Sequence, residues 1–263
     1  MEAKLYKIAR KYVEFVLTKV KILYAQHSFQ YNDIKVKYML KKNRKSKVLV
    51  IIFSACTRHG LKARYNYVKT LDGLGCNRLY ILDDYGEDGR GSYYLGKNFS
   101  FEEEKATEKL IQWVTDDVAP EKIIYCGSSK GGYAALNFGL QTKGSYIIAG
   151  APQFFLASYL KASGNLSAYR HILGNPCDEK DEYLNQYLRN RIINDPYFAT
   201  QRIYLHFSKK EHTYSEHVRY LIEEVERKKI VCEYDVGNYT DHSEISYFFP
   251  DYLRATIRKI QQL

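Results

Sequence analysis

The sequence predicts an α/β fold with a mostly parallel central sheet flanked by helices. From residue 48 to the end, apolar segments of strand length alternate with segments of helix length, the pattern of parallel strands joined by helical crossovers. The apolar run over residues 48–53 has the composition of a strand buried on both faces. A glycine-rich turn over residues 127–132 separates another β-type run from an alanine-rich helix. In such sheets the active site lies at the carboxyl ends of the strands.

The N-terminal part of the chain is predicted to be a basic amphipathic segment covering residues 1–45, followed by the main domain over residues 46–263. Apolar residues recur every three or four positions over residues 3–24, with lysines around the rest of the helix surface. Such a helix docks on its own domain more often than it lies on a membrane surface. Residues 29–40 alternate apolar and polar side chains, which predicts a strand near a sheet edge.

The remaining elements follow in order. Strands are predicted over residues 48–53, 78–82, 122–126, 146–149, 202–207 and 230–236. Helices are predicted over residues 61–72, 102–114, 131–140, 214–228 and 243–260. Residues 151–200 interrupt this alternation with many tyrosines and two Asn/Asp-Pro turns, so we expect a helical cap inserted over the site.

The composition excludes several classes of protein. Hydrophobic residues make up 45% and charged residues 27%, an ordinary globular balance. The longest apolar run is far shorter than the roughly 20 residues of a membrane-spanning helix. Five scattered cysteines form no CxxC pair, which fits a reducing cytosol and gives no zinc-ligand spacing. The N-terminus has no apolar core of a secretory signal, so we expect a cytoplasmic protein.

The net charge of +10 is unevenly distributed. Residues 1–71 hold 17 basic and three acidic side chains, and seven basic residues lie between positions 35 and 47 with no acid among them. Such a block attracts an anionic membrane, here the inner face, or an acidic polysaccharide, although a solvated basic surface explains it equally well. Nucleic acid is the least favoured partner, because no binding module accompanies the charge.

Ser129 is the candidate nucleophile. Gly127, Ser129 and Gly131 form the pattern Gly-x-Ser-x-Gly between a strand and a helix, the context of a nucleophile elbow, where small neighbours are required by the tight turn. Ser128 occupies the intervening position and should point elsewhere. A purely structural turn is the alternative; a phosphate-binding loop is disfavoured, because its full pattern is absent.

A nucleophilic serine needs a base, and the base needs an acid that orients it. His242 follows the last predicted strand and precedes the last helix, which is the position expected of the base. Glu211 follows the strand over residues 202–207 and is the candidate acid. The competing side chains lie within or after other elements: His206, His212, His217, Asp235 and Asp241.

Two loops complete the predicted site. The backbone N–H of Lys130 should provide one oxyanion-hole donor, and Ser54 or Ala55 the other, with no choice between them from sequence. The loop over residues 83–94 is rich in glycine and acidic residues, which can bind sugar hydroxyls or merely cap turns. Its candidate substrate-binding residues are Asp83, Asp84 and Arg90. No histidine clusters with these acids, so we predict neither a metal site nor a cofactor.

The strand–elbow–helix unit, with Glu211 and His242 downstream, resembles the α/β-hydrolase superfamily over residues 45–263. It is similar to the hydrolase-like domain of accessory-secretion acetyltransferase proteins and to hydrolase-like proteins of bacterial capsule and surface-glycan gene clusters. The resemblance implies an α/β-hydrolase fold, a Ser129–Glu211–His242 triad and acyl transfer involving a carbohydrate.

We therefore expect a serine esterase or O-acyltransferase that acts on an ester or acylated glycan through a covalent acyl-serine, in surface polysaccharide biosynthesis. The motif does not distinguish hydrolysis from transfer, because water and a sugar hydroxyl can resolve the same intermediate. The alternative from another class is a non-catalytic scaffold or binding protein of a polysaccharide or secretion assembly that retains the hydrolase fold. A peptidase is the weakest alternative.

Overall fold

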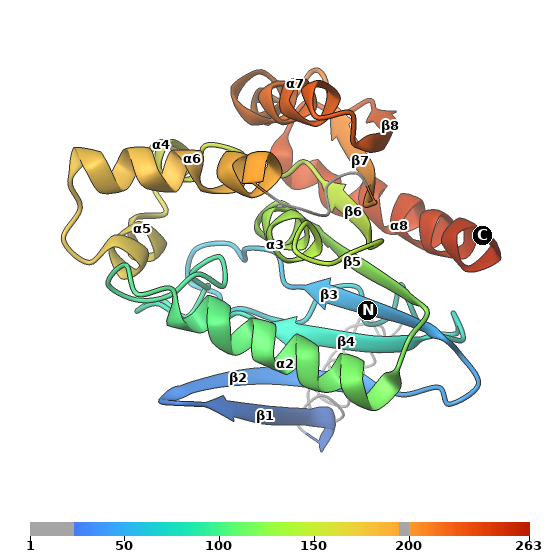
Figure 1. The fold of residues 1–263 in the computed structure, drawn as a ribbon. Helices are drawn as coiled ribbons and strands as arrows, with labels where there is room; N and C mark the ends of the chain where they lie inside the picture. The colour runs from blue at the N-terminus through green and yellow to red at the C-terminus, as the bar shows by residue number, and fades with distance from the viewer. Residues whose placement is uncertain (1–23, 195–199) are drawn as a thin grey trace, which may run out of the picture.

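The computed structural model describes residues 24–194 and 200–263. Eight strands form one sheet in the order β1-β2-β4-β3-β5-β6-β7-β8 (Figure 1). The strands are β1 (Gln26–Tyr31), β2 (Ile34–Lys41), β3 (Val48–Phe53), β4 (Asn77–Leu82), β5 (Lys122–Ser128), β6 (Tyr146–Gly150), β7 (Arg202–Ser208) and β8 (Val231–Gly237). All pairs from β4 through β8 are parallel, whereas β2 pairs antiparallel with both β1 and β4. The predicted mostly parallel sheet is thus confirmed.

Helices lie on both faces of this sheet (Figure 1). They are α2 (Glu102–Val118), α3 (Lys130–Gly139), α4 (Leu156–Ala162), α5 (Leu166–Leu173), α6 (Asp178–Asn194), α7 (Arg219–Arg227) and α8 (Ile245–Gln262), with short turns η1 (Tyr214–Val218) and η2 (His242–Glu244). The segment between β6 and β7, where a cap was expected, contains α4, α5 and α6. The helix predicted over residues 3–24 lies, apart from its last residue, outside the described residues. Among those residues, no helix combines the length and apolar composition needed to cross a bilayer.

The central strand β3 divides two hydrophobic cores. All six of its residues are buried, as the continuous apolar run predicts for a strand covered on both faces. Leu49 and Ile51 belong to the core beneath α2 and α3, whereas Val50 and Ile52 belong to the core beneath α8. The chain runs from β3 to β4 on one side and to β5 on the other, so the carboxyl ends of β3 and β5 flank a topological switch point, where α/β sheets bind ligands.

The single edge strand predicted over residues 29–40 is a hairpin instead. β1 and β2 pair antiparallel up to Tyr31 opposite Ile34, and Asn32 adopts a left-handed φ of 49° at the turn. The apolar alternation shifts register between Tyr31 and Ile34, and that shift marks the turn in the sequence. Because β2 also pairs with β4, the sheet begins N-terminal to residue 46.

The helix predicted over residues 61–72 is absent; the chain between β3 and β4 is an irregular loop with turns. Tertiary hydrogen bonds hold this loop: Ala63 N–H donates to the Gly89 carbonyl at 2.8 Å, and the Tyr67 hydroxyl contacts Ser128. Tyr67 has a left-handed φ of 59°, which interrupts any helix. The loop forms one wall of the site described below.

The block of basic residues between positions 35 and 47 is partly neutralised by acids far away in the sequence. Lys37 lies 2.5 Å from Asp84, Lys41 lies 3.8 Å from Asp72, and Lys42 pairs with Asp117. The basic surface is therefore smaller than the sequence suggests, because the pairing acids become neighbours only in the folded chain.

Candidate active site

Ser129 lies in the tight turn between β5 and α3. Its φ of 51° and ψ of −121° fall in a region that non-glycine residues rarely adopt, so the backbone is strained at this serine. A Cβ on Gly127 would lie 2.5 Å from the Gly131 backbone, and a Cβ on Gly131 would lie 2.7 Å from the Phe53 carbonyl oxygen. The glycines of the motif are thus required by close backbone approach, as expected for a nucleophile elbow.

The three side chains predicted as a triad are joined by hydrogen bonds. His242 Nε2 lies 2.8 Å from Ser129 Oγ, and His242 Nδ1 lies 2.8 Å from Glu211 Oε1. Ser129 follows β5, Glu211 follows β7, and His242 opens η2 after β8, so three strand ends bring them together. In this geometry the imidazole can accept the serine proton while the carboxylate fixes its tautomer and stabilises its charged form.

Glu211 is buried, but its surroundings stabilise the charged form of its carboxyl group. Burial raises the pKa of Glu211, but hydrogen bonds from His242 and Thr213 outweigh that effect and hold the pKa below its ordinary value. Thr213 donates its hydroxyl to Oε2 at 2.6 Å and its N–H to Oε1 at 3.3 Å. These donors fix the carboxylate in place opposite the imidazole.

The competing histidines His206 and His217 and the competing acids have other partners, whereas His212 Nδ1 lies 3.6 Å from Glu211 Oε1. His206 is buried, and its Nδ1 lies 2.5 Å from Asp235 Oδ2. Burial lowers the pKa of His217 to about 4, so this imidazole is neutral at pH 7. Asp241 caps η2 by accepting the N–H of Ser243 at 2.8 Å. None of these groups is hydrogen-bonded to the elbow serine.

The segment that carries His242 is fixed by local bonds. The Ser208 hydroxyl at the end of β7 donates to the Tyr239 carbonyl and accepts the Tyr239 N–H, which ties this segment to the sheet. Asp241 and Glu244 form a capping box around η2. The pattern Asp-x-x-Glu is visible in the sequence and could have predicted the rigid helix start that positions the histidine.

Of the three predicted oxyanion-hole donors, the N–H groups of Ser54 and Ala55 already donate to protein side chains. The N–H of Lys130 opens α3, where the first N–H groups lack helical partners and the helix dipole favours negative charge. Ser54 N–H donates to the Tyr94 hydroxyl at 2.6 Å, and Ala55 N–H donates to Asn66 Oδ1 at 2.9 Å. Of these two, only Ala55 lines the cavity beside Ser129. The N–H of Ala55 is therefore the better candidate for the second oxyanion-hole donor, and it requires its hydrogen bond to Asn66 to break.

Asp83 lies beneath the site rather than in it. The Lys130 side chain is fully buried, and its Nζ lies 2.9 Å from Asp83 Oδ2 while also donating to the Arg90 carbonyl. Asp83 further accepts the N–H groups of Ser92 at 2.8 Å and Tyr94 at 3.2 Å, and it has no exposed surface. This geometry does not fit the expected contact of Asp83 with substrate; the pair instead anchors its loop to the elbow.

We expect Asp83→Asn to lower the free energy of unfolding by about 3–5 kcal/mol, because it leaves the Lys130 ammonium buried without its carboxylate. Urea unfolding followed by circular dichroism would measure the loss. The matched control is Asp84→Asn: Asp84 pairs with Lys37 at a partly exposed position, where such a pair contributes about 1 kcal/mol or less. Equal losses in the two variants would contradict the assignment.

A cavity of about 790 Å³ opens beside the triad. Its walls come from the loop after β3, the elbow, α4, the start of α5 and the segment around η2. Arg90 lines it, with its guanidinium donating to the Thr57 carbonyl at 2.6 and 2.9 Å and to Asn165 Oδ1 at 2.9 Å. Asp84, paired with Lys37, is not among the lining residues.

Two residues that the sequence motifs did not mark also contact Ser129. Gln153 is completely buried after β6, and its Nε2 donates to Ser129 Oγ at 3.1 Å. Tyr159 on α4 lines the cavity; burial raises the pKa of Tyr159 to about 12, so its hydroxyl stays protonated beside Ser129. The position of Gln153 just after a parallel strand could have marked it in the sequence as a site residue. No sequence pattern marked Tyr159.

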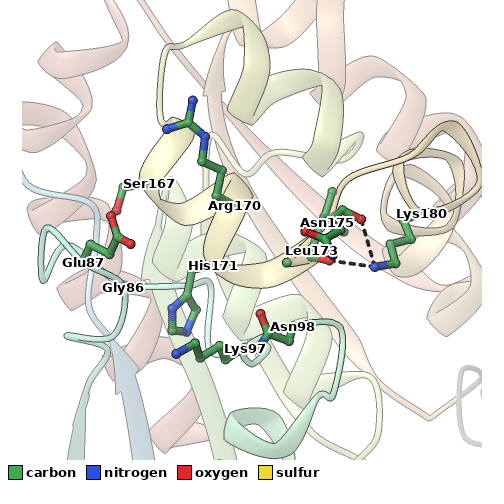
Figure 2. A pocket seen from close by; sticks show the side chains of 11 residues that line it. Gly86, Glu87, Lys97, Asn98, Ser167, Arg170, His171, Leu173, Asn175 and Lys180 are labelled. Atoms are coloured by element: carbon green, nitrogen blue, oxygen red, sulfur yellow. Dashed lines mark hydrogen bonds between the residues drawn. The ribbon is translucent and has the colours of Figure 1, made fainter.

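A second cavity, of about 720 Å³, lies along α5 and contains no member of the triad (Figure 2). Its charged lining side chains are Glu87, Lys97, Arg170 and Lys180, and His171 also lines it. Among residues 24–194 and 200–263, no group of three or more histidine, cysteine, aspartate or glutamate side chains is arranged to hold a metal ion.

Comparisons with known proteins give structural but not sequence matches. No protein-family model matches the chain, and no curated protein matches it. The capsule O-acetyltransferase of Neisseria meningitidis serogroup A superposes with a TM-score of 0.72 at 22% identity, covering 90% of this chain and 94% of that one. The glycosylation-associated Gap123 complex of Streptococcus agalactiae gives 0.74 at 18% identity, covering 89% of this chain and 46% of that one. The fluorophosphonate-binding serine hydrolase F of Staphylococcus aureus gives 0.64 at 13% identity, covering 90% and 97%. The chain therefore has an α/β-hydrolase fold related to that of capsule acetyltransferases.

Proposed function

We propose that this chain is a serine acyltransferase or esterase that works through a covalent acyl-Ser129. The observation that carries the proposal is the continuous chain of hydrogen bonds from Ser129 through His242 to the buried Glu211, at the strained turn of an elbow. Such a turn costs on the order of 1–3 kcal/mol and persists where its geometry is used.

The reaction follows from this geometry in two halves. His242 Nε2 accepts the hydroxyl proton as Ser129 Oγ bonds to the acyl carbon, and the carbonyl oxygen becomes an oxyanion beside the Lys130 N–H. The intermediate collapses when the bond to the leaving group breaks, and His242 protonates that group. In the second half His242 takes a proton from an incoming hydroxyl, whose oxygen attacks the acyl-serine and releases Ser129.

The incoming hydroxyl can belong to water or to a carbohydrate. The structurally similar protein of Neisseria meningitidis is a capsule O-acetyltransferase, and one of its structures is a complex with CoA. On this likeness we propose an acyl thioester or ester as donor and a surface-glycan hydroxyl as acceptor. The likeness to serine hydrolases supports hydrolysis as the competing outcome.

Trapping the acyl-enzyme tests the proposal. The protein is mixed with acetyl-CoA or p-nitrophenyl acetate, quenched in acid and analysed by peptide mass spectrometry, and we expect one acetyl group on Ser129. Ser128→Ala is the matched control, because Ser128 bonds to the Tyr67 hydroxyl rather than to His242 and should leave the adduct in place. A folded wild-type protein that acquires no adduct from either donor would contradict the proposal and favour the non-catalytic scaffold.

A further inference from the structure

The cavity beside Ser129 contains two arginines whose side chains have no partner among the described residues. Arg58 and Arg64, on the loop after β3, line the same cavity as Ser129 and His242, and both are exposed to solvent. Across the described part of the chain, neither guanidinium makes a hydrogen bond, an ion pair or a ring contact with protein. Two cations placed beside a nucleophile and left unpaired are available to a ligand.

The third arginine of the cavity, Arg90, differs from these two because its guanidinium is bonded to protein. Arg90 is buried, and its guanidinium donates hydrogen bonds to the Thr57 carbonyl and to Asn165. These bonds connect the loop after β3 to the start of α5, two walls of the cavity. Removing Arg90 would therefore disturb the fold. Arg58 and Arg64 form no such bonds with the described residues, so a ligand in the cavity explains their positions better than a stabilising role does.

The loop that carries these arginines is fixed by other groups. The Thr57 hydroxyl donates to the Leu61 carbonyl at 2.5 Å, and Ala55 N–H donates to Asn66 Oδ1 at 2.9 Å. None of these bonds involves the guanidinium of Arg58 or Arg64. A variant that lacks both side chains keeps the bonds that shape the loop, so its effects report on ligand binding.

The acidic side chain that lines this cavity forms no ion pair with these cations. Asp241 is the acidic residue among those that line the cavity, and its Oδ1 accepts the N–H of Ser243. That hydrogen bond lowers the pKa of Asp241, but no ion pair joins it to Arg58 or Arg64. A concave site with an excess of one charge raises the local concentration of ligands of the opposite charge.

We propose that Arg58 and Arg64 form an anion subsite of the catalytic cavity, which binds a phosphate or carboxylate group of a substrate while its reacting group lies at Ser129. This inference rests on the proposed function and names the charge class of its substrate. The planar guanidinium matches both anions through paired hydrogen bonds. The anion can belong to the acyl donor, as the phosphates of CoA do, or to an acidic glycan acceptor.

The second cavity is a weaker anion site. Lys180 Nζ already donates to the carbonyls of Leu173 and Asn175, at 2.9 and 3.0 Å, and His171 Nε2 lies 2.8 Å from Glu103. In Figure 2 the Arg170 guanidinium points away from His171. Lys180 and His171 are thus already engaged, and Ser129 is not among the residues that line this cavity.

Paired charged and neutral substrates test the subsite. KM is measured for acetyl-CoA against S-acetylpantetheine, which carries the same thioester without phosphates, and for an oligogalacturonate acceptor against its methyl ester. We expect Arg58→Ala/Arg64→Ala to raise KM for one charged substrate about 10- to 100-fold relative to its neutral analogue. The pair that responds identifies which substrate carries the anion. Arg58→Lys/Arg64→Lys should restore part of the lost affinity, because lysine keeps the positive charge but lacks the paired N–H donors of the planar guanidinium.

The control removes the same charge elsewhere. Arg44→Ala/Lys45→Ala alters two exposed cations before β3, at the opposite end of that strand from the triad, and should leave both KM ratios unchanged. A loss of the same size in the control would show a general charge effect and overturn the subsite.

A readout without turnover separates this inference from the proposed function. CoA or oligogalacturonate should slow fluorophosphonate labelling of Ser129, and the double alanine variant and added salt should weaken that protection. Labelling that neither anion slows, or protection equal in wild type and variant, would overturn the subsite while leaving the nucleophile intact. Absence of labelling in folded wild type would count instead against the proposed function.

Discussion

Ser129→Ala should lower acyl turnover by about 10⁴- to 10⁶-fold and abolish fluorophosphonate labelling, since loss of a triad nucleophile removes the covalent route. Binding and the oxyanion donors remain, so a small residual rate above the uncatalysed reaction is expected. The measurement is kcat/KM for p-nitrophenyl acetate, together with labelling followed by peptide mapping. No other change in the site should cost more, because His242 and Glu211 act only through this oxygen.

The backbone at position 129 offers an internal control for folding. Because φ is 51° there, Ser129→Gly should relieve strain and raise the unfolding temperature, while losing activity as completely as Ser129→Ala. Activity lost together with increased stability cannot be attributed to misfolding. Turnover retained in both variants would exclude the acyl-serine mechanism, and Cys56, which lines the same cavity, would become the rival nucleophile.

The elements that could be predicted from sequence are those whose pattern is local. β3 is an apolar run because both of its faces are buried, and the Ser129 turn needs small residues because backbones approach within contact distance. The proximity of Glu211 and His242 could be predicted because topology places residues that follow parallel strands at one edge of the sheet. Each of these inferences uses a constraint that acts within a few residues or through chain order alone.

The features that were missed depend on contacts between distant segments. The loop around Tyr67 carries enough apolar spacing to suggest a helix, but bonds to Gly89 and Ser128 hold it in another shape. Asp83 looked like a ligand-binding acid, because nothing near it in the sequence reveals that Lys130 lies against it. Gln153 reaches Ser129 only once β5 and β6 are paired.

The distribution of charge could likewise be predicted from sequence, whereas the pairing of the charged side chains could not. The excess of basic residues near the N-terminus is plain in the sequence, yet Lys37 and Lys42 find acids 47 and 75 positions away. Arg58 and Arg64 do not stand out in the sequence of a basic chain; only the fold shows that they line the cavity beside Ser129 without a partner among the described residues. Net charge therefore does not locate an anion-binding site. The site is indicated by which cations lack an acidic partner in the folded chain.

Glu211→Gln should lower kcat/KM by about 10²- to 10⁴-fold with little change in KM, because the amide keeps the shape of the carboxylate and loses its charge. The neutral side chain no longer stabilises the imidazolium that forms when Ser129 attacks, and its NH₂ group can face Nδ1 and select the wrong tautomer. Asp235→Asn is the matched control. That carboxylate also bonds to a histidine, His206, which lies opposite it in the paired strands β7 and β8, but it lies outside the triad and should leave turnover unchanged.

The same variant has a distinct signature in the pH dependence of stability. The pKa of Glu211 is held below its ordinary value, so its contribution to stability is fully present above that value and is lost as pH falls through the folded-state pKa. Glutamine has no such transition. On acidification from neutral pH, wild type should therefore lose more unfolding free energy than Glu211→Gln, as measured by urea titrations at a series of pH values. Parallel pH profiles, or turnover unaffected by the substitution, would mean that Glu211 is not the ionised partner of His242.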